Sequence, residues 1–135
     1  MMPVLVALLV SLFTGNEQRP ANQPESAQLI LYREKEFISG LGKAYTFKIN
    51  EQKQGKLSPN RFVQVTIPVG RIKVEFDNDY FTHSRPLWLS VQAGQTYYVK
   101  AAVEVDFLSS MMVMAPVDPQ QARQELRRMK PEQPD

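Results

Sequence analysis

The chain lacks cysteine altogether and has a single histidine, which removes much of the usual catalytic and metal-binding chemistry. Without thiols there can be no disulfide bond, thiolate metal site or cysteine nucleophile. His83 lies in a segment rich in turn residues, and no HExxH or similar spacing provides the partners that a catalytic triad or a histidine metal site requires. We therefore interpret His83 as a solvated or locally hydrogen-bonded loop residue.

Nucleotide-binding and hydrolase motifs are missing as well. The sequence contains no Walker loop, dinucleotide glycine fingerprint or GxSxG elbow. Glu75, Glu104 and Asp106 fall on outward strand positions, and Asp77 and Asp79 fit a hairpin turn better than a calcium loop. We expect a protein that is not an enzyme and that carries no cofactor and no metal.

Outside the last predicted helix, charge of one sign is not concentrated anywhere in the folded part of the chain. Sixteen basic residues face fourteen acidic ones, giving a net charge of +2, and both kinds are spread along the sequence. Nucleic-acid binding usually requires a basic stripe, and the one basic cluster lies in the last predicted helix. We expect no nucleic-acid partner.

Long apolar runs are also absent, except at the N-terminus. Residues 3–15 carry no charge, but as a helix they would span only about 20 Å of a hydrocarbon core that is about 30 Å thick. The run fits the apolar part of a signal peptide better, so we assign residues 1–15 to a signal-like apolar segment, with a buried first strand or helix as the alternative. Asn16 stands where a lipoprotein would carry its lipidated cysteine, so we do not expect a lipid anchor there.

Residues 16–26 are polar and contain two prolines, as is typical of a flexible tether. The combination predicts an exported protein. Any membrane association would then depend on the N-terminal apolar segment alone.

What the sequence does contain is alternation with a period of two, which is typical of half-buried strands. In one stretch Tyr45, Phe47 and Ile49 share a face, and in another Ile72 and Val74 do so. The predicted strands are AQLILYR, YTFKIN, FVQVTI, RIKVEF, LWLSV, TYYVKAAVEV and SMMVMAPV. About seven short strands predict one all-β domain over residues 27–117, an antiparallel β-sandwich or a partly closed barrel.

Two glycine turns predict β-hairpins. Residues 68–70, Pro-Val-Gly, should pair Ile67 with Ile72. Ala93 and Gly94 should form the corner of the second hairpin.

The second hairpin would place Trp88, Tyr98 and Lys100 together on the outward face of one sheet. These residues are our first candidate site, because a tryptophan and a tyrosine beside a lysine can stack on a ligand with a cation–π contact. The alternative is that a loop or the helix covers them.

A short helix is predicted over residues 118–130, followed by a tail at 131–135. Asp118 is a suitable N-cap and Pro119 suits the first helical position. The preceding strand is apolar on both faces, so it is either covered by this helix or exposed to a partner. The corresponding candidate interface consists of Met112, Met114, Leu126 and Met129.

The motifs LILYR, IPVGRIKVEF and LSVQAGQTYYVKA resemble those of the bacterial domain of unknown function 2846 family. The resemblance covers residues 27–117. It implies a bacterial protein exported to the periplasm or cell envelope, a β-sandwich of the PEGA or prealbumin-like type. Members of this family are often lipoproteins, and the resemblance assigns no catalytic residues.

These observations together predict a non-enzymatic accessory or protein-interaction module whose partner is another envelope protein. One alternative is a module that binds glycan or peptidoglycan through the outward aromatic face. A second alternative is a cytoplasmic interaction protein.

Overall fold

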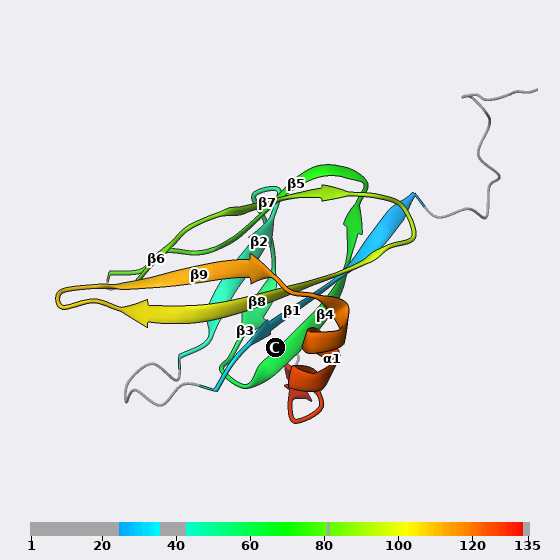
Figure 1. The fold of residues 1–135 in the computed structure, drawn as a ribbon. Coiled ribbons are helices and arrows are strands. Elements are labelled where there is room, and N and C mark those ends of the chain that lie inside the picture. The colour runs from blue at the N-terminus through cyan, green and yellow to red at the C-terminus, as the bar shows by residue number, and fades with distance from the viewer. Residues whose placement is uncertain (1–24, 36–42, 81, 134–135) are drawn as a thin grey trace, which may run out of the picture.

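A computed structural model of the chain describes residues 25–35, 43–80 and 82–133, which form an all-β sandwich with one short helix (Figure 1). The predicted apolar segment 1–15 and most of the predicted tether lie outside the described residues. In chain order the elements are β1 (Ser26–Arg33), β2 (Tyr45–Ile49), β3 (Gln52–Leu57), β4 (Arg61–Pro68), β5 (Gly70–Phe76), β6 (Thr82–Ser84), β7 (Leu87–Val91), β8 (Thr96–Val105), β9 (Ser110–Pro116), α1 (Pro119–Leu126) and β10 (Lys130–Pro131).

Two sheets face each other. One has six strands in the order β10-β4-β1-β8-β9-β6, and the other has four in the order β3-β2-β5-β7. Most neighbouring strands are antiparallel, whereas β1–β8, β6–β9 and β4–β10 are parallel pairs. The predicted fold class, an all-β sandwich with a short C-terminal helix, is confirmed.

The core forms where the alternating apolar positions of the two sheets meet. In β2, Phe47 and Ile49 are buried while the intervening Lys48 is partly exposed. From the six-stranded sheet, Leu29 and Leu31 of β1 point into the same core. Period-two alternation therefore identified the buried face of these strands correctly.

The turn at residues 68–70 is not the predicted hairpin. β4 pairs with β1 and β10, while β5 pairs with β2 and β7, so the turn carries the chain from one sheet to the other. Ile67 and Ile72 therefore do not pair across a hairpin. The glycine has the expected role, since Gly70 has φ of 112°, but a crossing between sheets uses the same turn residues as a hairpin.

The turn at Ala93 and Gly94 also crosses between sheets. Gly94 N–H donates to the Ser26 carbonyl and Gln28 N–H to the Gln95 carbonyl, both at 2.9 Å. These bonds attach the turn to β1, so that β8 continues beside β1 and leaves β7 in the other sheet.

Three strands have no counterpart in the prediction. β3 contains lysine, glutamine and glycine and lies at a sheet edge, β6 is three residues long, and β10 is two. Their residues carry no apolar alternation, because β3 is mostly solvated and β6 and β10 are too short to show a period. His83 consequently lies on β6 rather than in a loop, and it is exposed.

The helix is shorter than predicted, ending at Leu126 instead of residue 130. Its start is as expected, because the Asp118 carboxylate accepts a hydrogen bond from Gln121 N–H at 3.1 Å. The chain then turns tightly, with Met129 N–H donating to the Leu126 carbonyl, and Lys130 and Pro131 pair with β4. Residue 131 is thus part of a sheet and not of a tail.

Among the described residues, no helix is long and apolar enough to cross a membrane.

Candidate interaction sites

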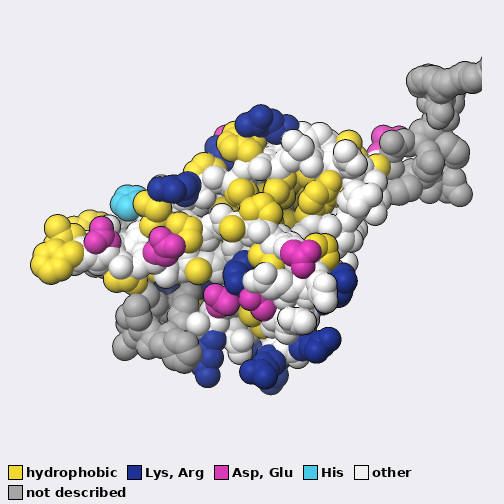
Figure 2. Space-filling view, viewed as in Figure 1, with side chains coloured by type: hydrophobic (Ala, Val, Ile, Leu, Met, Phe, Trp, Pro, Cys, Tyr) yellow, Lys and Arg dark blue, Asp and Glu magenta, His cyan; other side chains and the backbone are white. Residues whose placement is uncertain are grey.

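The turn between β8 and β9 carries several exposed large apolar side chains close together in the sequence, including Phe107, the most exposed one among the described residues. Phe107 is 92% exposed, the adjacent Leu108 is 87% exposed and Val105 is 50% exposed. In Figure 1 this hairpin extends beyond the body of the sandwich, and Figure 2 shows the apolar side chains gathered at its end. We call Val105, Phe107 and Leu108 the hairpin tip.

Hydrogen bonds order the backbone of the hairpin tip. The strands pair up to Val105 and Ser110, and Asp106 N–H donates to the Ser109 carbonyl at 2.7 Å. The Asp106 carboxylate accepts from Phe107 N–H at 2.6 Å. Phe107 and Leu108 thus project from a closed turn.

A shallow cavity of about 370 Å³ adjoins the hairpin tip. It is lined by Arg85, Glu104, Val105, Asp106, Ser109, Ser110 and Met111. The carboxylates of Glu104 and Asp106 outnumber the one cation of this lining, Arg85. We call this charged border of the hairpin tip the acidic margin.

Trp88 is the one residue of the predicted aromatic platform that is strongly exposed, at 51%. It lies on β7, on the outer face of the four-stranded sheet. The Arg71 guanidinium lies 4.8 Å and the Lys73 ammonium 5.9 Å from the indole centroid. Lys73 also forms ion pairs with Glu51 at 3.3 Å and Glu75 at 3.5 Å.

Tyr98 and Lys100 do not join Trp88. Both are on β8, in the six-stranded sheet, because the turn at Gly94 crosses between sheets. The predicted platform of Trp88, Tyr98 and Lys100 is therefore wrong as a geometric group. For Trp88, the alternative of a covered side chain is wrong too.

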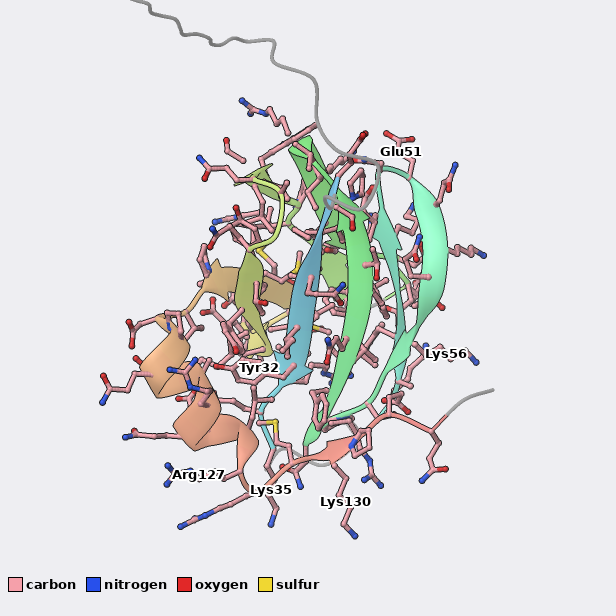
Figure 3. All side chains as sticks on the ribbon, turned by 90° about the vertical axis from the view of Figure 1, so that its right-hand side faces the viewer. Tyr32, Lys35, Glu51, Lys56, Arg127 and Lys130 are labelled. Carbon is pink, nitrogen blue, oxygen red and sulfur yellow. The ribbon has the colours of Figure 1, made fainter. Side chains whose placement is uncertain are left out.

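Lys100 instead helps to attach α1 to the outer face of the six-stranded sheet. Its ammonium lies 3.1 Å from the Glu125 carboxylate and 3.4 Å from that of Glu34. The buried Tyr32 hydroxyl donates to the other oxygen of Glu125 at 2.6 Å, and Figure 3 shows Tyr32 on the side of β1 that faces the helix.

This network shifts the ionisation of its members. Burial, followed by the hydrogen bond to the Glu125 carboxylate, raises the pKa of Tyr32. Burial opposes the ionisation of Glu125, but hydrogen bonds from Tyr32, Lys100 and Gln121 outweigh it and lower the pKa of this carboxyl. The same carboxylates raise the pKa of Lys100 against the effect of its burial. These shifts favour a neutral Tyr32 hydroxyl, a protonated Lys100 and an ionised Glu125, the states that the hydrogen bonds and ion pairs of the network require.

The predicted methionine interface is not assembled. Met112 is fully buried, and Met114 packs against the core between the sheets. Leu126 and Met129 are half-buried at the helix and the following turn, on the other side of the six-stranded sheet. The core, rather than α1, covers the inward methionines of β9.

Asp77 and Asp79 act as turn residues. Asp79 accepts a hydrogen bond from Thr82 N–H at 2.7 Å and pairs with Lys43 at 2.9 Å, while Asp77 pairs with Lys48 at 3.3 Å. Within residues 25–35, 43–80 and 82–133, no cluster of histidine and carboxylate side chains could hold a metal ion.

Sequence reasoning missed two surfaces. One is the hairpin tip, for which the signal was an adjacent apolar pair inside a run of turn-forming residues, DFLSS. The other is a cavity of about 490 Å³ between β3 and β4. Its lining includes Phe47, Phe62, Val65 and Lys56, and it could not be found without predicting β3.

Comparison of the chain with models of known protein families, with curated proteins and with solved structures finds no match.

Proposed function

We propose that the chain is a non-enzymatic, exported binding module of the bacterial envelope that docks to another protein through the hairpin tip. The observation that carries the proposal is the adjacent pair Phe107 and Leu108, exposed at the end of an ordered hairpin. Exposed large apolar groups of this kind are typical of interaction sites.

The energetics favour such a role. Burying a phenylalanine or leucine side chain contributes roughly 1.5–3 kcal/mol each, and anchors of this type dominate interface energies. Because the turn is already closed by the bonds of Asp106, little backbone freedom remains to be lost on binding. A pre-ordered apolar tip thus suits insertion into a pocket of a partner.

The acidic margin favours a protein over a lipid surface as that partner. Glu104 and Asp106 are exposed beside the tip, and anionic headgroups would repel them. A pocket with a basic rim would complement these carboxylates.

Site-specific photo-crosslinking in cells tests this proposal. A photo-reactive amino acid in place of Phe107 should give one discrete adduct, and the same residue in place of the exposed Gln64 on β4 should give none. Equal labelling at both positions, or none at Phe107, would contradict docking through the tip. Binding of the chain to phosphatidylglycerol vesicles that Phe107→Ser abolishes would instead indicate a lipid target.

Export is tested by fractionation. The proposal expects the chain outside the cytosol, and recovery in the cytosol at full precursor mass would support the cytoplasmic alternative.

A second candidate function, glycan binding, is favoured by one observation. The exposed indole of Trp88 is flanked by the cations of Arg71 and Lys73, which suits stacking on an anionic sugar. Isothermal titration calorimetry with soluble peptidoglycan fragments should then show binding heat for the wild type and for Phe107→Ser, but none for Trp88→Ala. Equal heats for the wild type and Trp88→Ala would eliminate this candidate.

A further inference from the structure

β3 and β7 form the two edges of the four-stranded sheet, and only β3 is protected against pairing with another strand. β3 carries Lys53, Lys56 and Gly55 (φ of 157°), and its pairing with β2 is shifted between Phe47 and Lys48. Charges, glycine and bulges of this kind protect an edge against pairing with another strand.

The edges of the six-stranded sheet are protected as well. β10 is two residues long and ends in Pro131. β6 covers Ser110 to Met112 of β9, and Pro116 interrupts the remainder of that strand. Prolines and very short edge strands both prevent further pairing.

β7 has none of these devices. Its sequence, Leu-Trp-Leu-Ser-Val, contains no charge, proline or glycine, and its register with β5 is regular over all its residues. Among the described strands it pairs with β5 alone. An uncharged, regular edge is a ready template for another strand.

The hydrogen bonds of β5 show which groups of β7 are free. Asn50 N–H donates to the Lys73 carbonyl, so the backbone N–H and C=O of Lys73 point toward β2. Because these groups alternate along a strand, those of Ile72 and Val74 point toward β7. Ile72 lies opposite Leu89. The backbone groups of Leu89 therefore form the hydrogen bonds to β5. The backbone groups of Trp88 and Ser90 point away from β5, with no partner among the described residues.

We propose that a second copy of this chain pairs with β7 through an antiparallel strand related by a two-fold axis at Leu89. In this register Trp88 exchanges both of its backbone hydrogen bonds with Ser90 of the second copy, and symmetry repeats the pair. The four-stranded sheets of the two copies then form one continuous sheet.

The side chains are self-complementary in this register. On the outer face the large Trp88 lies opposite the small Ser90, and on the inner face Leu89 meets Leu89 while Leu87 meets Val91. No charged group of β7 opposes another, because the strand has none. This match of large with small and apolar with apolar argues for a second copy over an unrelated strand.

The ladder also ends naturally on both sides. The next pair would join Pro86 to Gln92, but proline has no N–H, and Gln92 N–H already donates to the Tyr97 hydroxyl at 2.8 Å. Pairing is thus confined to β7, which gives a closed dimer and not an open filament.

Because the chain has no cysteine, single-cysteine variants test this register cleanly. Leu89 of the two copies should form a pair with Cα atoms about 4.5 Å apart, within the range of a disulfide. Under mild oxidation Leu89→Cys should therefore become a disulfide-linked dimer.

Val91→Cys is the matched control, since Val91 is equally buried on the same face but lies opposite Leu87. Alone it should stay uncrosslinked, whereas a mixture of Leu87→Cys and Val91→Cys should give the mixed disulfide. Urea unfolding of each reduced variant confirms that it is folded.

Sedimentation of the full wild-type chain should give twice the monomer mass of 15.5 kDa. Ser90→Pro, which removes an outward N–H and leaves the bonds to β5 intact, should shift the equilibrium to monomer, while Gln54→Pro on β3 should not. A wild-type monomer, equal crosslinking of Leu89→Cys and Val91→Cys, or a dimer in which Leu89→Cys does not crosslink would each overturn the proposal.

Discussion

The attachment of α1 depends on the Tyr32 hydroxyl, and Tyr32→Phe measures its contribution. The hydroxyl is buried and donates to the ionised Glu125 at 2.6 Å. A hydrogen bond to a charged group contributes about 1.5–3 kcal/mol. Because Lys100 and Gln121 still bond to the carboxylate, the variant leaves no buried charge unpaired. We expect the free energy of unfolding to fall by that amount.

Urea denaturation followed by far-ultraviolet circular dichroism measures this loss, as a lower midpoint with an unchanged slope. Tyr98→Phe is the control, since no described residue bonds to that hydroxyl, and it should change the free energy by less than about 0.5 kcal/mol.

The pH dependence of the stability difference between the wild type and Tyr32→Phe tests whether the bond to Glu125 is its cause. The pKa of Glu125 is lowered from 4.5, so the charged bond is present above pH 4.5 and is lost as the pH falls through the lower value of the folded state. The difference between the wild type and Tyr32→Phe should therefore shrink in acid. A difference that is absent at neutral pH, or is independent of pH, would refute the assigned network.

Three further results are expected. Raising the pH above 10.0 should destabilise the wild type more than Tyr32→Phe, because the raised pKa of Tyr32 keeps this hydroxyl protonated in the folded state while it ionises in the unfolded state. The extra fall in the free energy of unfolding is at most about 1.4 kcal/mol per pH unit. Equal pH slopes for the two proteins would contradict this prediction. Met112→Ala should lower the free energy of unfolding, measured by urea denaturation, by about 2–5 kcal/mol because it truncates a core side chain, whereas the exposed Phe107→Ala should leave it nearly unchanged. A larger loss for Phe107→Ala than for Met112→Ala would contradict the burial of Met112. Asp118→Ala should cost about 0.5–2 kcal/mol through loss of the N-cap, and an unchanged midpoint would show that the cap is dispensable.

The local part of the fold could be predicted from the sequence. Alternation along β2 and β5 identified Phe47, Ile49, Ile72 and Val74 as buried, because a strand presents successive side chains to opposite faces whatever its neighbours are. The N-cap at Asp118 was predictable for the same reason, since it depends on contacts within one turn.

Strand pairing could not be predicted in the same way. The turns at Gly70 and Gly94 have the residues of hairpins, yet both connect different sheets. What decides between the two is the pairing of β1 with β4 and β8, which are distant in sequence. No local pattern contains that information.

The candidate site failed through the same error. Trp88 and Lys100 were joined by an assumed hairpin, and once β7 and β8 are assigned to different sheets the two residues have different surroundings. The exposure of Phe107 and Leu108 was not predicted, because alternation indicates which face of a strand is buried and gives no information about a turn.

The position of β1 determines the order in which this protein can fold. β1 is synthesised before its two neighbours, β4 and β8, and the parallel pairing of Gln28 with Thr96 must wait until β8 has left the ribosome. Until then the side of β1 that β8 will pair with has no partner strand, although the sheet that faces Leu29 and Leu31 is already synthesised, so completion of the six-stranded sheet depends on late, long-range contacts that form slowly. A chain truncated after β7 would keep β1 and the four-stranded sheet that faces it, but would lose β8, β9 and β10 from the sheet to which β1 belongs.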